Sequence, residues 1–310
     1  MKIYKRCILI LSLIVLTDFV AAQAPMLPPT NLGLSNMLDG IPPGTGWYVQ
    51  QFIQNYQTIT NRGFNGADVG GEKINSLLSL SQLIYLTKTK VAGGYLGFTV
   101  LIPVVRLSAN GSGPAPTLNP NPLGDIIAGS VIQWFNKRLF DMNFSHRVEL
   151  DLIPPVGAYQ SAYMVNPGSH LFTITSNYAF TIFPTKNFSV SMRHHLNYFF
   201  DEIGTQAKPG LSYNFNYSLE YTLVSSLRAE VAGYYLKQLV QDSNNGDYHY
   251  YQDNFDIPDT REQVFAYGAG FSYVTPTGLF LELKGMQETA ARNRPEGFRT
   301  TLVLSYKLDK

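Results

Sequence analysis

The sequence has one cysteine, little charge, and no long hydrophobic run after its first residues. Its cysteine, Cys7, lies within residues 1–22, which we expect to be removed on export. The mature chain would then contain no cysteine, which excludes disulfides, thiol catalysis and thiolate metal sites. No later stretch reaches the ~18 uninterrupted apolar residues of a transmembrane helix, so we expect no spanning helix.

Charge is scarce and nearly balanced. Only 15% of residues are charged, where a soluble domain carries about 25%. Aromatic residues make up 13% of the chain and the mean hydropathy is −0.05, which is typical of strands that alternate between apolar and polar residues. Removing residues 1–22 takes away three of the 23 basic and one of the 22 acidic residues. The resulting charge gives no electrostatic case for nucleic-acid binding.

Residues 1–22 have the composition of a secretory signal peptide. A basic start with Lys2, Lys5 and Arg6 precedes an apolar core from Ile8 to Leu16 and a small-residue end at Ala22, and we predict cleavage before Gln23. An exported chain without a spanning helix or lipid anchor is periplasmic, secreted or a barrel of the outer membrane.

Residues 23–46 are rich in proline and glycine. Such a segment forms neither a regular helix nor a central strand, and we interpret it as an irregular N-terminal lead. Two placements stay open for it, either in the periplasm or folded into a barrel as a small plug.

The clearest strand in the sequence is the run from Leu211 to Leu223. Its odd-numbered residues are all apolar or aromatic and its even-numbered residues are all polar, so one face is apolar and the other is polar. At roughly 3.3 Å per residue this strand is long for a soluble domain but suits a tilted membrane crossing of about 9–11 residues with some overhang. A long strand of a soluble sandwich is the alternative.

Residues 47–310 contain further strand-like runs of this kind. We predict strands near 47–57, 74–87, 92–107, 123–135, 142–153, 170–182, 187–200, 210–223, 227–240, 263–275, 278–288 and 298–308. The connections between them alternate strictly between long and short, which an up-and-down barrel produces and a sandwich does not. The fold class is therefore predicted as all-β, a transmembrane antiparallel up-and-down β-barrel of about 12 strands (range 10–14). One run departs from the pattern, because Val100 to Val105 is apolar on both faces and so lines an apolar section of lumen or meets a plug.

The inward faces of these strands collect charged and amide side chains. They form either a polar pathway or a charge network that holds the lumen partly closed, although any barrel of this size needs a polar interior. The predicted lumen-facing residues are Arg147, Glu149, Asp151, Arg193, His195, Asn214, Asn216, Glu220, Arg228, Glu230, Glu282, Lys284 and Arg299.

The 241–262 connection is predicted to be a long external loop. Its aromatic residues Tyr248, Tyr250, Tyr251 and Phe255 are expected to be exposed, where they would capture an apolar solute or contact lipopolysaccharide. Its five aspartates do not have the spacing of an EF-hand, and we predict no metal site there.

Catalytic patterns are weak. A barrel hydrolase would need a serine and a histidine with an orienting amide or acid, and no histidine has the expected sequence context. His146 and His194 are predicted to face outward, and His194 and His195 point to opposite faces of a strand, so they do not share a metal. We predict no catalytic residue, cofactor or metal.

Several motifs resemble those of one family throughout the mature chain. They occupy residues 34–44 (LSNMLDGIPPG), 123–126 (LGDI), 146–151 (HRVELD), 155–159 (PVGAY), 165–169 (VNPGS), 233–238 (GYYLKQ) with Asp242, and 293–297 (NRPEG). The sequence is similar in these motifs to the MetA-pathway of phenol degradation family of outer-membrane transporters. The resemblance implies a β-barrel that admits hydrophobic or aromatic compounds, and it carries over no catalytic residue and no particular substrate.

These observations predict a channel or transporter for passive uptake of small hydrophobic or aromatic compounds. The alternative is a structural or surface-interaction barrel with a closed lumen, and a barrel hydrolase is the third hypothesis. The expected location is the outer membrane of a diderm (Gram-negative) bacterium, with both termini periplasmic. The expected partners are outer-membrane lipid and lipopolysaccharide, a small apolar or aromatic solute, and the barrel-assembly machinery, with no nucleic acid.

Overall fold

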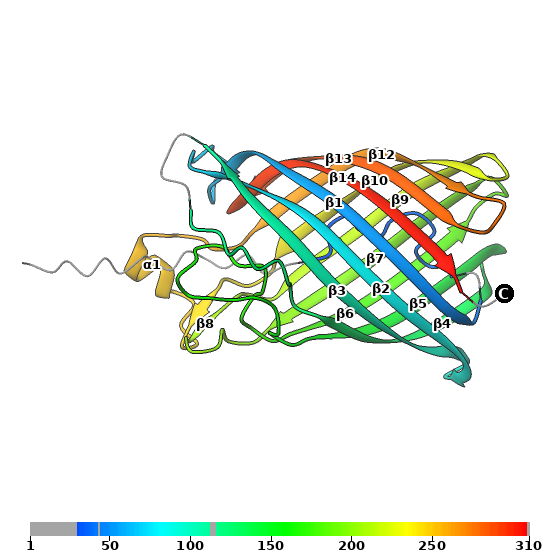
Figure 1. The fold of residues 1–310 in the computed structure, drawn as a ribbon, viewed down its shortest axis with the longest axis horizontal. Helices are drawn as coiled ribbons and strands as arrows, with labels where there is room; N and C mark the ends of the chain where they lie inside the picture. The colour runs from blue at the N-terminus through cyan, green and yellow to red at the C-terminus, as the bar shows by residue number, and fades with distance from the viewer. Residues whose placement is uncertain (1–29, 43, 112–115, 309–310) are drawn as a thin grey trace, which may run out of the picture.

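The chain folds as a closed antiparallel barrel. The computed structural model describes residues 30–42, 44–111 and 116–308, and the expected signal peptide lies outside them. Twelve strands form the barrel, each pairing with the barrel strands next to it in the chain, and the last pairs with the first from Tyr48 opposite Lys307 onward (Figure 1). Closure leaves no unpaired edge. The predicted fold class and strand number are confirmed.

The barrel strands are β1 (Gly46–Arg62), β2 (Lys73–Val91), β3 (Gly94–Asn110), β4 (Ile127–Leu139), β5 (Met142–Ile153), β6 (Thr173–Phe183), β7 (Phe188–Phe199), β9 (Ser212–Val224), β10 (Leu227–Gln238), β12 (Gln263–Val274), β13 (Phe280–Arg292) and β14 (Arg294–Lys307). Two very short strands, β8 (Ala207–Lys208) and β11 (Ser243–Asn244), pair with each other outside the barrel, and α1 is a single helix over Tyr250–Phe255. No helix in the described part of the chain is long and apolar enough to cross a membrane.

The alternation in sequence becomes an inner and an outer face. In β9 the polar residues from Ser212 to Glu220 are at most 1% exposed, whereas Leu219, Tyr221 and Leu223 are 45–52% exposed. Successive side chains of a strand point to opposite faces, so the polar set faces the lumen and the apolar set faces outward. Exposed apolar residues on most other strands continue this outer surface.

The two ends of the barrel differ in their connections. Between described strands, one end has the short turns 92–93, 140–141, 184–187, 225–226 and 275–279, and the chain's last described residues lie there too (Figure 1). We call this the turn end. The other, the loop end, carries the connections 63–72, 154–172, 200–211 and 239–262 together with β8, β11 and α1.

One predicted long connection is wrong. Residues 289–297 do not form a loop, because β13 continues to Arg292 and β14 begins at Arg294. Asn293 between them has φ +52°, a left-handed conformation that asparagine tolerates better than most residues. Pro295 lies close to the start of β14, where a strand accepts proline. Asn293 alone therefore connects the two long strands, and Pro295 and Gly297 belong to β14.

Strand β3 is longer than its pairing with β4. The ladder between them ends where Leu101 pairs with Ile127. Beyond it, β3 contacts the loop-end connection instead, with Val105 N donating to Pro122 O at 2.7 Å and Gly124 N donating to Pro103 O at 3.0 Å. This part of the wall is therefore completed by irregular chain.

Candidate functional site: the barrel lumen

The irregular segment before β1 lies inside the barrel. We call residues 30–42 the lumen segment (the dark blue coil in Figure 1). Gly33 N donates to Asn216 Oδ1 at 3.0 Å, Leu38 N to Glu220 Oε1 at 2.9 Å, and Gly40 N to Thr181 Oγ1 at 3.1 Å. All three acceptors belong to side chains of the inner wall.

Wall side chains also donate to the carbonyl groups of the lumen segment. Asn214 Nδ2 donates to Asn31 O at 2.7 Å, and Gln133 Nε2 donates to Gly40 O at 2.9 Å. A buried backbone needs partners for its polar groups, and this segment forms neither helix nor strand. The polar lumen therefore supplies hydrogen bonds that regular secondary structure would otherwise provide.

Gly40 lies directly against the backbone of the wall. A Cβ at this residue would lie 2.4 Å from the backbone N of Thr181 and 2.6 Å from the carbonyl carbon of Phe180. Backbone atoms of a closed barrel do not yield as a flexible side chain would. Glycine is therefore required here for space rather than for an unusual φ angle.

All thirteen residues predicted to face the lumen lie on strands, and their partners and burial place them on the inner wall. Ten of them are buried, and the three arginines Arg147, Arg228 and Arg299 are partly exposed. The structure brings most of them into ion pairs or hydrogen bonds. His195, Asp151 and Glu230 join no ion pair in the described part of the chain, although Asp151 Oδ2 accepts a hydrogen bond of 2.6 Å from Asn177 and Glu230 Oε2 accepts one of 2.6 Å from Ser218.

Asp39 of the lumen segment is held by two arginines of the wall. Arg147 Nη2 lies 2.8 Å from Asp39 Oδ1, and Arg193 Nη1 lies 3.4 Å from the same oxygen. Arg193 also donates to Glu149, which itself lies 3.6 Å from Arg147 Nε. Because these groups are largely buried, each charge has an opposite charge beside it, as burial requires.

A lysine on the opposite wall holds the middle of the lumen segment. Lys284 Nζ donates to Leu34 O at 3.1 Å and to Asn36 Oδ1 at 2.7 Å, and it pairs with Glu282 at 2.7 Å. The amide of Asn36 donates in turn to two backbone carbonyls of the wall, at Tyr217 and Gly233, both at 3.0 Å. On β9 and its neighbours, Glu220 accepts from Ser189 and Arg228 while Glu230 accepts from Ser218.

A third cluster surrounds Glu288, which is not among the thirteen residues predicted to face the lumen. Tyr56 and Tyr234 each donate to its carboxylate at 2.7 Å. Arg299 donates to the Tyr234 hydroxyl at 2.7 Å and lies 4.1 Å from the ring centroid of Tyr56. Glu288 shares the strand face of Glu282 and Lys284, so the same two-residue period identifies it. Asp39, in contrast, lies in a segment without periodicity.

We call the inner wall of β14, β1, β2 and β3 the apolar side of the lumen because of its apolar clusters, although polar residues such as Gln54 and Gln82 also lie there. Leu32 packs in a further apolar cluster on β10, β12 and β13. Leu34 of the lumen segment packs with a cluster from four neighbouring strands, made up of Phe52, Leu80 and Val303 with Leu78 and Leu101 at its edge. A second cluster toward the turn end contains Tyr48, Leu86 and Val131, with Ile84, Tyr95 and Phe135 packed against it. The run at 100–105 is apolar on both faces because its outward residues are exposed while Leu101 joins the inner cluster.

The four loop aromatics do not form one exposed set. Tyr248 is 51% exposed, whereas Tyr251 is 1% exposed, so the expectation that Tyr251 is exposed is wrong. Its ring lies 5.4 Å from Tyr250 and 6.2 Å from Phe255, measured between centroids. The ring of Tyr251 is the core of this loop and is not available to a solute, and Tyr250 and Phe255 are only partly exposed.

Two further expectations concern histidines and aspartates. His146 stacks on Trp134 with centroids 4.7 Å apart, and His194 Nδ1 lies 2.7 Å from the hydroxyl of Tyr213, so both contact aromatic residues of the outer face. In the described part of the chain no group of three or more His, Cys, Asp or Glu residues is placed to hold a metal ion.

Comparison with solved structures agrees with this architecture. A closed barrel with an apolar outer surface and a largely polar interior is typical of outer-membrane channels. The fold is similar to the crystal structure of the COG4313 outer membrane channel from Pseudomonas putida F1, with a TM-score of 0.72 and 15% identity over 86% of this chain and 96% of that chain. Lower similarities include the KdgM porin in complex with disordered oligogalacturonate (TM-score 0.42, 9% identity, 84% and 99% covered). The translocator domain of the autotransporter NalP from Neisseria meningitidis is another (TM-score 0.42, 14% identity, 86% and 89% covered).

The sequence defines the family directly. The chain belongs to the family described as "Putative MetA-pathway of phenol degradation", which matches residues 59–304. No match was found among curated proteins. The family resemblance inferred from the sequence motifs is confirmed.

Proposed function

We propose that this protein is an outer-membrane channel for passive uptake of small hydrophobic or aromatic compounds. The observation that carries the proposal is the division of the lumen into two sides. The polar side is occupied by the lumen segment, which is bound through Asp39, Asn36 and the backbone of Gly33 and Gly40. The apolar side offers a wall with which a hydrophobic solute makes more favourable contact than a sugar does, because both surfaces are then removed from water.

The lumen segment supplies the selectivity in this proposal. A polar solute would have to displace a segment that is bound through charged groups and many hydrogen bonds. An apolar solute contacts the side of the lumen where the side chain of Leu34 packs in an apolar cluster. No cofactor, catalytic group or energy source enters this process, and we propose that the protein is not an enzyme.

The same proposal places the protein in the outer membrane of a diderm bacterium. The turn end, with the last described residues of the chain, would face the periplasm, and the loop end would face the lipopolysaccharide, as in barrels with short periplasmic turns and longer external loops. Exposed apolar residues such as Leu219 and Val148 would contact lipid. Insertion of such a barrel would require the barrel-assembly machinery.

A structural or surface-interaction barrel with a closed lumen is the second candidate. It is favoured by the number of contacts that hold the lumen segment, because a segment bound at Asn31, Gly33, Asn36, Asp39 and Gly40 closes much of the polar side. The two candidates differ in whether any solute crosses.

Uptake of two probes separates the candidates. Cells with and without the protein are supplied with toluene, or with xylose as a sugar of comparable size, and the rate of uptake of each is measured. Protein-dependent uptake of toluene alone supports the hydrophobic channel. Equal acceleration of xylose would identify a general porin, and no acceleration of either would favour the closed barrel.

A further inference from the structure

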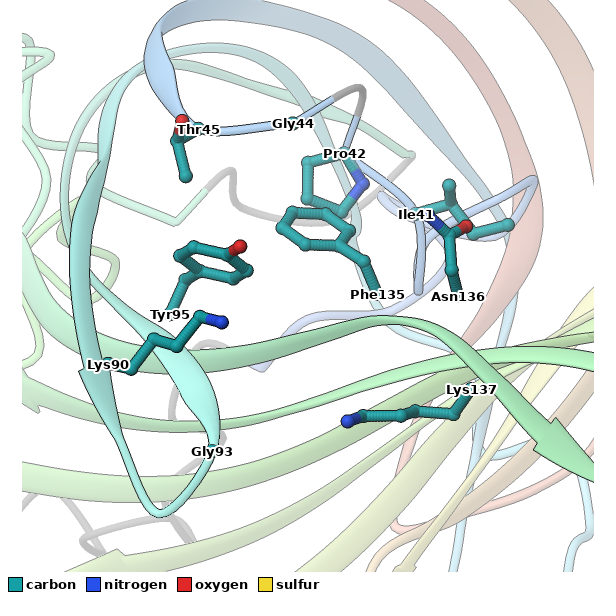
Figure 2. Close-up of a pocket in the computed structure, with 10 residues that line it drawn as sticks. All are labelled: Ile41, Pro42, Gly44, Thr45, Lys90, Gly93, Tyr95, Phe135, Asn136 and Lys137. Carbon is teal, nitrogen blue, oxygen red and sulfur yellow. The ribbon is translucent and has the colours of Figure 1, made fainter.

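A cavity of about 510 Å³ lies at the turn end of the barrel (Figure 2). Its apolar part is formed by Tyr95 of β3 and Phe135 of β4, together with Ile41 and Pro42 of the lumen segment. The rings of Tyr95 and Phe135 lie with centroids 5.5 Å apart, inclined by 51°. Both residues belong to the apolar cluster of the inner wall, so the cavity continues the apolar side of the lumen.

The same cavity is lined by two ammonium groups. Lys90 comes from the end of β2 and Lys137 from β4. Figure 2 shows Lys90 next to the ring of Tyr95, and Lys137 lower in the view. Lys90 Nζ lies 5.1 Å from the ring centroid of Tyr95. Within the described residues, neither ammonium group has a carboxylate partner in an ion pair.

A third lysine lies close to this end of the lumen segment. Lys307 Nζ is 5.9 Å from the ring centroid of Tyr48. A Cβ placed at Gly44 would lie 3.7 Å from the same Nζ atom. Gly44 is itself part of the cavity wall. The cavity therefore combines two ammonium groups with an apolar part, and a third lysine lies near its wall.

This combination fits one class of ligand. Small-molecule sites are usually mostly apolar clefts of about 300–1,000 Å³ in which a few polar groups fix the ligand's orientation. An ammonium group binds a carboxylate or phosphate oxygen as a point charge. A neutral hydrocarbon would use the rings and leave both lysines without a counter-ion.

We propose that the turn-end cavity binds a small organic anion that has an apolar, ring-sized body and one carboxylate. The body packs between Tyr95, Phe135 and Pro42, and the carboxylate lies between Lys90 and Lys137. This inference rests on the proposed function, because it makes the cavity the last binding site on the apolar side of the lumen and extends the solutes to aromatic acids.

Binding of benzoate and of its neutral analogue benzamide tests the proposal. The purified full-length protein in a nonionic detergent is titrated with each compound by calorimetry, with detergent micelles alone as the blank. We expect benzoate to bind about tenfold more tightly, the effect of a charge-assisted hydrogen bond, and this preference to weaken at high salt because charge interactions are screened. Equal affinity for the two compounds would overturn the proposal.

Variants assign the preference to this cavity. The double variant Lys90→Gln/Lys137→Gln should lose the preference for benzoate, while weak binding of benzamide persists. Lys186→Gln changes an exposed lysine in the 184–187 turn of the same end and should leave the preference intact. Tyr95→Ala should weaken the binding of both compounds. A preference that survives in the double variant, or is lost in Lys186→Gln, would overturn the assignment.

Failure of this inference is distinguishable from failure of the proposed function. If toluene uptake depends on the protein but benzoate shows no preference, the channel remains and the anion site is rejected. If benzoate binds through the two lysines but no probe crosses, the site stands as a binding site and the transport proposal is rejected.

Discussion

At the scale of single residues, Asp39 connects the lumen segment to the wall. Its carboxylate is shared by Arg147 and Arg193, and all three groups are largely shielded from water. Removing one member of such a group leaves a buried charge without a counter-ion. The free-energy cost is larger than that of breaking an exposed ion pair. The strength with which the segment is held should therefore depend on this one carboxylate more than on any exposed acid.

We predict that Asp39→Asn loosens the lumen segment. The loss of charge-assisted hydrogen bonds to two arginines should weaken its attachment by about 2 kcal/mol, and xylose permeation into proteoliposomes should rise. Asp68→Asn is the matched control, because Asp68 accepts from Gly70 N in an exposed connection of the loop end. Unchanged xylose permeation in Asp39→Asn would show that this carboxylate does not keep the segment in place.

Leu101 tests the apolar side in the same way. Leu101→Asn places an amide against the cluster that contains Leu34 and Phe52, and the lost apolar contact, about 1–2 kcal/mol, should lower toluene uptake several-fold. Leu101→Met keeps the volume and the apolar character and should retain uptake. Equal rates for the two variants would contradict a path along this wall.

At the scale of elements, the 239–262 connection is stabilised by a buried acid. Asp242 Oδ1 accepts from Gly210 N at 2.9 Å and from Gln238 Nε2 at 2.6 Å, while its Oδ2 is buried without a hydrogen-bond partner among the described residues. Burial raises the pKa of Asp242 to about 7, although its hydrogen bonds with Gly210 and Gln238 act in the opposite direction. In an opened loop the carboxyl would return to an ordinary pKa near 4.

We predict that this loop opens more readily as the pH rises. Between pH 4 and about 7 the closed loop keeps a proton that the open loop releases, so closure weakens with rising pH and then levels off above pH 7. Limited proteolysis of the connection should be faster at pH 8 than at pH 5, after correction for the protease's own pH dependence. Asp242→Asn removes this titrating carboxyl and should lose most of the difference, whereas an undiminished difference would assign the effect to another residue, such as the buried Glu262.

How much the sequence predicts depends on whether a residue lies in a periodic element. The strand at 211–223 and the inward position of residues such as Glu220 follow from a two-residue period, which sets both burial and direction. The turn at Asn293 was missed because its residues also favour loops. The path of the lumen segment and the partners of Asp39 depend on contacts more than a hundred residues apart, which no local pattern encodes, and the burial of Tyr251 depends on packing within its loop.

At the scale of the whole molecule, the barrel combines three surfaces. Its outside is apolar, one side of its inside is polar and holds the lumen segment, and the other side is apolar from the Leu34 cluster to the cavity beside Tyr95. We propose that the lumen segment closes the polar side to water and ions. A barrel wall of this size would otherwise enclose a path for water and ions.

Ion conductance in a planar lipid bilayer measures this closure most directly. The intact protein is compared with a variant that lacks residues 31–41, after heat-dependent gel mobility has confirmed that both barrels are folded. We predict small conductance steps for the intact protein and steps several times larger for the variant. Equal conductance of the two proteins would show that the lumen segment does not close the polar side of the lumen.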